Sequence, residues 1–362
     1  MIEINIVKHR DEIGQLIELF RVSFGGETSE KLWEWKYINN PIVSSSPEVI
    51  VACDGGRIVG ARPFLPVELW VKNERILAAE HCDTMVHPEF RNQGLFNRMG
   101  EYSLQYLKER YNYALSYGFP GLMSRAGFLK QGYRVVVPIE MMFRPVNYQR
   151  IFSKKLKRDG LGRGIGYFCD KVIIKKKLPI LKAGSIEVEI FDSYVHELEA
   201  IDSLRKTTTI EYVRREKNLR WRFDQHPEHK YRYITAKIEG TLCGYAVISV
   251  QEQGNSLNYG MIIDYLVKNE DLGYFGALIE KAMVELTKTG CDLIMIWACS
   301  ESGFKEELRK RFGFSSTFSF PYNRFIGSGY FEALSLTDQA IRGINIYDKS
   351  NWRITNIYPD NT

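Results

Sequence analysis

The chain repeats one pattern of landmarks, and this internal repeat limits the possible folds more than any other feature. Ile2–Ile6 matches Ile186–Ile190 at an offset of 184 residues. Four further landmarks recur at offsets between 181 and 186: Trp35-Lys36-Tyr37 with Trp221-Arg222-Phe223, Gly56 and Gly60 with Gly240 and Gly244, Asp83 with Asp264, and Gly132-Tyr133 with Gly313-Phe314. An offset this steady indicates two copies of one supersecondary unit.

Both copies mix strand-like and helix-like runs, which predicts an α/β class of fold with a mixed sheet (α+β). The 362 residues provide enough chain for two or three domains. We expect four segments: a first domain at residues 1–145, a basic linker at 146–185, a degenerate second copy at 186–325, and a C-terminal tail at 326–362.

The stretch His81–Phe96 is the strongest candidate for a binding site. A strand-like run ends at Val86, Pro88 breaks it, and the turn Arg91–Gly94 leads into a helix-like segment. The first turn of a helix leaves backbone amides unpaired, and glycine lets an anion approach them because it has no Cβ. Strand–turn–helix junctions are common, so on these residues alone a phosphate site competes with an ordinary connection.

These residues resemble motif A of the Gcn5-related N-acetyltransferases, the GNAT superfamily. That motif reads Val-x-Pro and then Gln/Arg-x-x-Gly-x-Gly/Ala, and the corresponding residues here are Val86, Pro88, Arg91, Gly94 and Phe96. Phe96 replaces the usual Gly or Ala, and we expect its side chain to narrow the approach to the turn. Gly121–Tyr133 resembles the following segment of these proteins, which ends in Gly-Phe or Gly-Tyr. The resemblance implies two tandem acyl-CoA N-acyltransferase (GNAT-like) domains.

The resemblance also implies that the chain binds acetyl-CoA and needs no metal. Backbone near Met85 and Val86 would pair with the pantetheine. The pyrophosphate would lie on the turn and helix start, at Arg91, Asn92, Gln93, Gly94, Leu95, Phe96 and Asn97. In the second copy, an offset of 181 puts Leu272, Phe275 and Ala277 at the positions of the motif's Arg, Gly and Phe. We therefore expect one acetyl-CoA per chain.

Two side chains on the preceding strand are candidates for accepting a proton from an amine. Residues of equal parity share one face of a strand, so His81 and Asp83 should lie side by side, with Glu80 pointing away. Histidine titrates near neutral pH and suits this task, although a half-buried His81 bound to a backbone carbonyl is an equally good interpretation. Asp83 recurs as Asp264 in the copy that lacks the turn, which favours a structural role for both aspartates.

An acid for the leaving thiolate is a separate requirement. Many GNAT enzymes use a tyrosine in the pattern Asn-x-x-Ala-x-x-x-Tyr-x-x-x-Gly-Phe. Anchored on Gly132 and Tyr133, this pattern puts Phe128 at the tyrosine position, and phenylalanine donates no proton. We expect Tyr117 to be the acid, because it ends the strand beside which the thioester should lie. Tyr133 is the second candidate.

Composition is that of an ordinary globular protein. Apolar residues make up 44% of the chain and charged residues 26%. The longest uncharged window, residues 111–124, is too short for a membrane span, and the N-terminus does not resemble a signal peptide. The six cysteines include no Cys-x-x-Cys pair. Buried, reduced thiols are the expected state, which favours a cytoplasmic protein.

The linker carries a concentrated positive charge. Residues 150–182 contain eleven Lys or Arg and two Asp. Such a charge attracts an anionic membrane surface, a nucleic acid or an acidic substrate. Because few aromatic residues and no nucleic-acid motif accompany the charge, we favour a solvated linker and expect no nucleic-acid partner.

Together these features predict an N-acetyltransferase that moves the acetyl group of acetyl-CoA to a primary amine of a small molecule, an amino sugar or a peptide. One alternative is a non-catalytic acyl-CoA-binding or regulatory module, which the incomplete set of catalytic residues favours. Another is a membrane- or nucleic-acid-associated protein that acts through the basic linker. Release of free CoA thiol in the presence of amines separates the first function from the other two.

Overall fold

The computed structural model describes residues 1–42, 47–110, 112–156, 186–207, 209–252, 257–299, 302–320, 322–324, 329–337 and 341–359. Most of the basic linker expected at residues 146–185 lies outside this part of the chain. No described helix combines the length and the apolar character that a membrane span requires.

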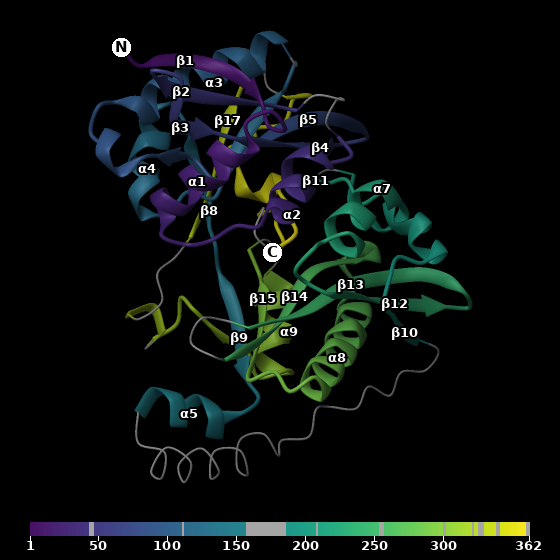
Figure 1. Ribbon diagram of the computed structural model, residues 1–362. Helices are drawn as coiled ribbons and strands as arrows, with labels where there is room; N and C mark the ends of the chain where they lie inside the picture. Colours follow the sequence, from purple (N-terminus) through teal and green to yellow (C-terminus); the bar gives the residue numbers. More distant parts are fainter. Residues whose placement is uncertain are drawn as a thin grey trace.

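Most of the N-terminal half forms strands with helices packed on them in the upper part of Figure 1, and its last strand and last helix reach into the lower part. Its elements in chain order are β1 (Glu3–Lys8), α1 (Ile13–Phe24), α2 (Glu30–Trp33), the π-helical turn η1 (Glu34–Ile38), β2 (Glu48–Asp54), β3 (Arg57–Arg62), β4 (Phe64–Val71), β5 (Glu74–His81), β6 (Met85–Val86), the 3-10 turn η2 (Pro88–Phe90), α3 (Leu95–Arg110), β7 (Leu115–Gly118), α4 (Leu122–Lys130), β8 (Arg134–Pro138), β9 (Met141–Pro145) and α5 (Tyr148–Leu156).

The C-terminal half repeats much of this order. Its elements are β10 (Glu187–Phe191), η4 (His196–Leu204), β11 (Ile210–Tyr212), α7 (Glu216–Leu219), η5 (Arg220–Asp224), β12 (Tyr231–Ile238), β13 (Thr241–Glu252), β14 (Asn258–Val267), η6 (Lys268–Glu270), α8 (Leu272–Lys288), β15 (Leu293–Trp297), α9 (Ser302–Lys310), β16 (Ser315–Ser316), η7 (Tyr322–Arg324), β17 (Tyr330–Ser335) and η8 (Lys349–Asn351). The rare π-helical conformation occurs in both η1 and η5, and these turns begin 186 residues apart, at Glu34 and Arg220. The sequence repeat is therefore also a structural repeat.

The strands of the described residues form three sheets, one antiparallel and two mixed. A four-stranded sheet has the order β1-β2-β3-β6, a six-stranded sheet β11-β4-β5-β7-β17-β8, and a seven-stranded sheet β10-β12-β13-β14-β15-β9-β16. The pairs β5–β7 and β14–β15 run parallel. In the chain, α3 lies between β5 and β7, and α8 lies between β14 and β15. This is the mixed α/β architecture expected from the sequence.

The first two sheets separate at one shared break. Pro63 alone divides β3 from β4, and Cys82–Thr84 divide β5 from β6. Pro63 has no amide to donate to a sheet ladder, and Asp83 has a positive φ of 43° that a strand does not allow. Both segments therefore leave their ladders at this point. The β3–β6 pair consequently belongs to one sheet and the β4–β5 pair to the next.

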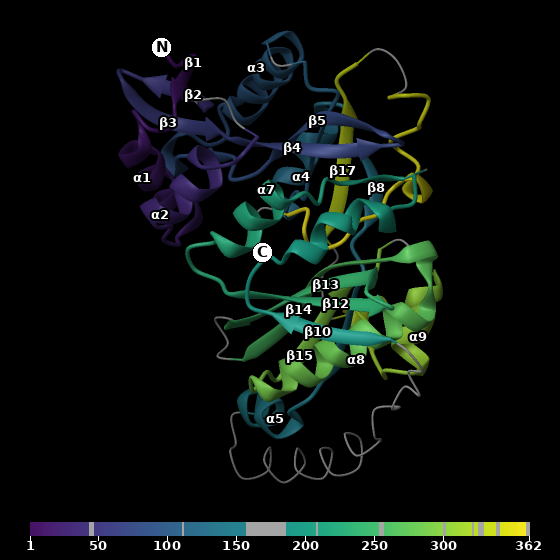
Figure 2. The ribbon, with the colours of Figure 1, turned by 90° about the vertical axis from the view of Figure 1, so that its right-hand side faces the viewer.

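The two halves also exchange strands, as the colours in Figures 1 and 2 show. β9, which ends the segment expected as the first domain, pairs with β15 and β16 of the seven-stranded sheet. β17, from the expected tail, lies between β7 and β8, with Ala333 opposite Tyr117 on one side and Arg134 on the other. The sheets thus cross the segment boundaries expected from the sequence.

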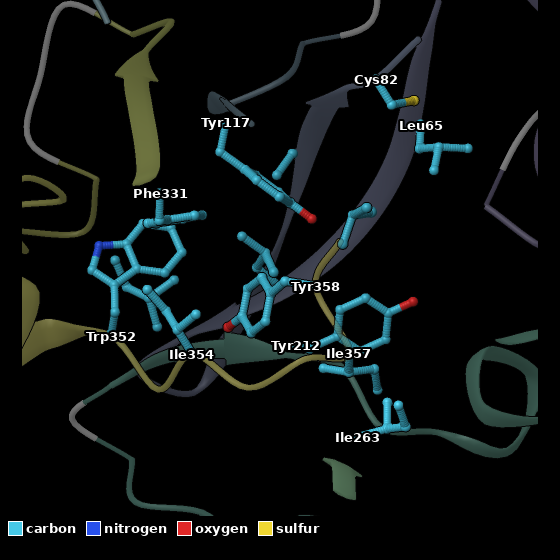
Figure 3. Packing of buried hydrophobic residues seen from close by; sticks show 14 of the residues in the cluster. Leu65, Cys82, Tyr117, Tyr212, Ile263, Phe331, Trp352, Ile354, Ile357 and Tyr358 are labelled. Atoms are coloured by element: carbon cyan, nitrogen blue, oxygen red, sulfur yellow. The ribbon is translucent and has the colours of Figure 1, made fainter. Parts of the chain in front are cut away.

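A hydrophobic core joins the halves and includes the C-terminal segment. Residues 352–359 are all buried. Figure 3 shows Tyr358 between Tyr117 of β7 and Tyr212 of β11, with Phe331 and Trp352 nearby. Large aromatic side chains bury much apolar surface, and each Å² removed from water stabilises the fold by roughly 25 cal/mol. This burial holds residues 352–359 between the two halves.

Candidate active site

The turn between η2 and α3 presents a row of open backbone amides. Asn92 and Gly94 have positive φ values of 62° and 74°, and residues 91–94 are exposed. The amides of Asn97 and Arg98 donate to the carbonyl of Gly94. Across the described chain, no acceptor is found for the amides of residues 92–96. This geometry suits an anion at the N-terminus of α3.

Arg91 fastens this turn to its surroundings. Its Nη2 donates to the carbonyl of Ser23 at 2.8 Å and its Nε to the carbonyl of Val86 at 3.3 Å. Ser23 lies in the last turn of α1, so Arg91 connects α1, β6 and the turn. Its positive charge remains beside the open amides, where it favours an anion.

The Phe96 ring points into the protein and not across the turn. A Cβ at Gly127 of α4 would lie only 2.3 Å from this ring, so Gly127 provides the room that the ring needs. The ring also lies 5.7 Å from that of Phe128, centre to centre. The expectation that Phe96 narrows the approach to the amides is therefore wrong. Its bulk is accommodated between α3 and α4.

A gap opens in the strand ladder next to this turn. β5 and β7 are paired from Ala78 and Leu115 to His81 and Gly118. Beyond that point the chain after His81 bends away and forms β6, which is the edge strand of its sheet. The backbone of Met85 and Val86 therefore has one side that none of the described strands covers, and an extended ligand can pair with such an edge.

The structure separates His81 from Asp83. His81 is buried, and its ring lies 6.2 Å from each of the rings of Phe128 and Tyr133. The Asp83 carboxylate instead accepts hydrogen bonds from Lys36 Nζ and the Tyr37 hydroxyl, both at 2.6 Å. The strand alternation that would place the two side by side ends at the positive φ of Asp83. Burial, together with nearby positive charge, lowers the pKa of His81 well below its usual value.

Asp264, the counterpart of Asp83, is also held by ionic and hydroxyl groups. Its carboxylate accepts hydrogen bonds from Arg214 and from the hydroxyls of Tyr245 and Thr355. Asp83 lies in the break between β5 and β6, whereas Asp264 lies within β14, next to a register shift of the β13–β14 pair, and each is bound to side chains of neighbouring elements. This arrangement favours the structural role that the repeat suggested.

Tyr117 has a partner that sequence reasoning missed. Its hydroxyl donates to Glu80 Oε2 at 3.3 Å, and both residues are buried. The two are side by side because Glu80 lies opposite Tyr117 in the parallel β5–β7 ladder. Burial, and then the charge of Glu80, raises the pKa of Tyr117 well above its usual value. Glu80 has the parity that points away from His81, but only the strand register reveals that Tyr117 shares its face.

The second copy closes the corresponding helix start with its own side chain. Asp271 Oδ1 accepts hydrogen bonds from the amides of Gly273 and Tyr274, at 2.8 and 2.9 Å. Gly273 and Tyr274 are the second and third residues of α8, as Phe96 and Asn97 are of α3. An internal carboxylate therefore takes the place that an anionic ligand would need.

Within the described ranges, no group of three His, Cys, Asp or Glu side chains is arranged to hold a metal ion. The described cysteines, which exclude Cys169, form no disulfides.

Residues 6–136 match the family model of the acetyltransferase (GNAT) domain. No curated protein matches the chain by sequence. Among solved structures, a GCN5-related N-acetyltransferase from Anabaena variabilis superposes with a TM-score of 0.62 and 12% identity, over 92% of this chain and 73% of that one. A tandem GNAT protein from the clavulanic acid biosynthesis pathway has a TM-score of 0.57 and 14% identity, over 94% of this chain and 100% of that one. Saccharomyces cerevisiae N-myristoyltransferase with bound myristoyl-CoA gives 0.57 and 11%, over 91% and 82%.

Proposed function

We propose that this chain, whose residues 6–136 are a GNAT domain within a tandem GNAT fold, transfers an acyl group from an acyl-CoA to an amine. The observation that carries this proposal is the row of open amides at residues 92–96, which adjoins the uncovered edge of β6. The amides fit a pyrophosphate, and the edge fits the amide groups of a pantetheine. Acetyl-CoA is the donor that the motif implies, and a primary amine of a small molecule, amino sugar or peptide is the acceptor.

The reaction requires a new N–C bond, cleavage of the C–S bond, and movement of one proton from the amine to the departing sulfur. The Glu80–Tyr117 pair is suited to this proton transfer, because a carboxylate can accept the amine proton while a tyrosine hydroxyl donates one. We therefore keep Tyr117 as the acid and add Glu80 as its partner. Asp83 is assigned to holding the kink between β5 and β6.

The second copy supports a single acyl-CoA site. Asp271 accepts hydrogen bonds from the amides of Gly273 and Tyr274 at the start of α8, whereas the amides of Leu95 and Phe96 at the start of α3 have no acceptor in the described chain. The C-terminal half then contributes β11 and β17, which complete the six-stranded sheet, and the side chains of Tyr212 and Tyr358 beside the Glu80–Tyr117 pair.

Release of CoA thiol from acetyl-CoA in the presence of a panel of primary amines tests the function. Gly94→Asp should abolish both binding and thiol release, because a carboxylate and a side chain enter the anion site. Gly240→Asp is a matched control: Gly94 and Gly240 share a φ of 74°, and both have open space around the Cβ position. Tight acetyl-CoA binding without thiol release for any amine would favour the non-catalytic module.

A further inference from the structure

Arg62 is a fully buried cation, and no side chain of the described residues is its counter-ion. None of its three guanidinium nitrogens has a hydrogen-bond partner of ordinary geometry in the described chain. Arg214, another buried arginine, differs sharply, because it pairs with Asp264 at 2.8 Å and Glu211 at 3.1 Å. The same side chain at the same burial thus has two carboxylates in one half and none in the other.

The surroundings of Arg62 are aromatic and uncharged. Its guanidinium lies 5.4 Å from the ring centre of Phe96 and 4.9 Å from that of Phe128. Burial lowers the pKa of Arg62, and the neighbouring Tyr133 hydroxyl is the group that opposes this shift. A guanidinium stays protonated in proteins, and burying it unpaired is costly. Cation–π contacts offset part of that penalty and supply no negative charge.

Two more polar side chains at the same strand break have atoms that are not satisfied, although the Pro63 carbonyl lies close enough to His81 to oppose the fall of its pKa. Neither ring nitrogen of His81 has a hydrogen bond of ordinary geometry within the described residues, and neither does the Thr84 hydroxyl. Arg62 and Thr84 each lie one residue beyond the last β3–β6 pair, Ala61 with Met85. His81 lies at the end of the β5–β7 ladder. The unpartnered donors therefore gather where the gap between the strands begins.

We propose that Arg62, with His81 and Thr84, binds a carboxylate at the far end of the acyl group. The donor class is a short dicarboxylic acid joined to CoA through one thioester, such as malonyl-, succinyl- or glutaryl-CoA. A guanidinium binds a carboxylate through two parallel hydrogen bonds, and the neutral imidazole and the hydroxyl can each donate another. This inference rests on the proposed function, since it names the acyl group of the same transfer.

The arrangement of faces assigns the carboxylate to the donor and not to the acceptor. Glu80 and His81 are consecutive residues of β5, so their side chains leave opposite faces of the strand. Glu80 and Tyr117 face the C-terminal segment, and the amine must approach the thioester from the side of its proton acceptor. The opposite side, where His81 and Arg62 lie beneath α4, remains for the acyl chain.

The test compares the affinities of succinyl-CoA and butyryl-CoA, which have acyl chains of equal length and differ in the terminal carboxylate. With no acceptor present, calorimetry should show that wild-type protein binds succinyl-CoA about tenfold to a hundredfold more tightly. In Arg62→Met this preference should disappear while butyryl-CoA still binds. Equal affinities in the wild type would overturn the proposal and leave the acyltransferase function standing. If none of the acyl-CoA compounds bound, both the carboxylate site and the acyltransferase function would be refuted.

Thermal unfolding of the apoprotein distinguishes recognition from structure. Arg62→Met removes an uncompensated buried charge, so the melting temperature should stay level or rise. Arg214→Met is the matched control and should lower the melting temperature, because it leaves Asp264 buried without its cation. A strong loss of stability in Arg62→Met would show that Arg62 supports the fold and would overturn the assignment.

Discussion

Trp35 and Trp221 hold each other through a reciprocal pair of hydrogen bonds. The indole of Trp35 donates to the carbonyl of Trp221 at 2.7 Å, and the indole of Trp221 donates to the carbonyl of Trp35 at 2.9 Å. The rings stack with their centres 5.1 Å apart. Each residue occupies the same position in its own copy. The two halves therefore contribute equivalent residues to a contact that has local two-fold symmetry.

We expect Trp35→Phe and Trp221→Phe each to lower the free energy of unfolding by about 1 kcal/mol, because each removes one buried indole donor and strands a carbonyl. Denaturant unfolding measures the effect. The double variant should show coupling, since the residues touch. Trp352→Phe is the control: its indole bonds to Ile346 within the same segment, so its effect should add to that of Trp35→Phe without coupling. Strict additivity of the Trp35 and Trp221 variants would contradict a coupled contact.

Tyr117→Phe should lower the turnover rate about tenfold to a thousandfold and leave acyl-CoA affinity nearly unchanged, the range found for a lost proton donor. Rates measured over a pH series check this expectation. Tyr212→Phe is the matched control, because it removes a hydroxyl from a buried tyrosine of the same core cluster. A Tyr117→Phe rate equal to that of the wild type at every pH would leave solvent as the acid.

Titration with acyl-CoA should give one site per chain. The open amides of residues 92–96 provide that site, and Asp271 closes the start of α8. Asp271→Ala should remove an N-cap and destabilise the protein by about 1 kcal/mol without adding a site. A stoichiometry of two in the wild type would show that the second copy also binds.

His9 should make the protein less stable in mild acid. Its ring accepts a hydrogen bond from the Trp33 indole, and burial lowers its pKa to about 3. The folded state thus takes up this proton less readily than the unfolded state, whose pKa is about 6.5, so stability falls as the pH drops from about 6.5 towards 3. The contribution is on the order of 2 kcal/mol between pH 7 and 4.5.

Melting temperatures across this pH range measure the slope. His9→Gln should flatten the slope relative to the wild type, while the same change at exposed His196 should leave it unaltered. Equal slopes for the wild type and His9→Gln would refute the assignment to His9.

The sequence predicted the features that depend on local chemistry. The repeat could be recognised because Trp35 and Trp221 keep their spacing, and the turn before α3 could be recognised because glycine at position 94 suits a positive φ. The pairing of strands that lie far apart in the sequence could not be predicted from local patterns. Glu80 and Tyr117 become neighbours only through the β5–β7 register, and Arg62 reveals its missing counter-ion only when its whole environment is known.

Strand exchange has a consequence for how the protein is made. β17 completes the sheet around β7 and β8, yet it lies about two hundred residues further along the chain. A ribosome therefore releases the whole N-terminal half long before the strand that closes its sheet. During that interval the β7 and β8 edges carry unpaired backbone, the kind of edge that invites aggregation. Closure of the six-stranded sheet must therefore await synthesis of β17, so the folding of the N-terminal half depends on a strand from the C-terminal half.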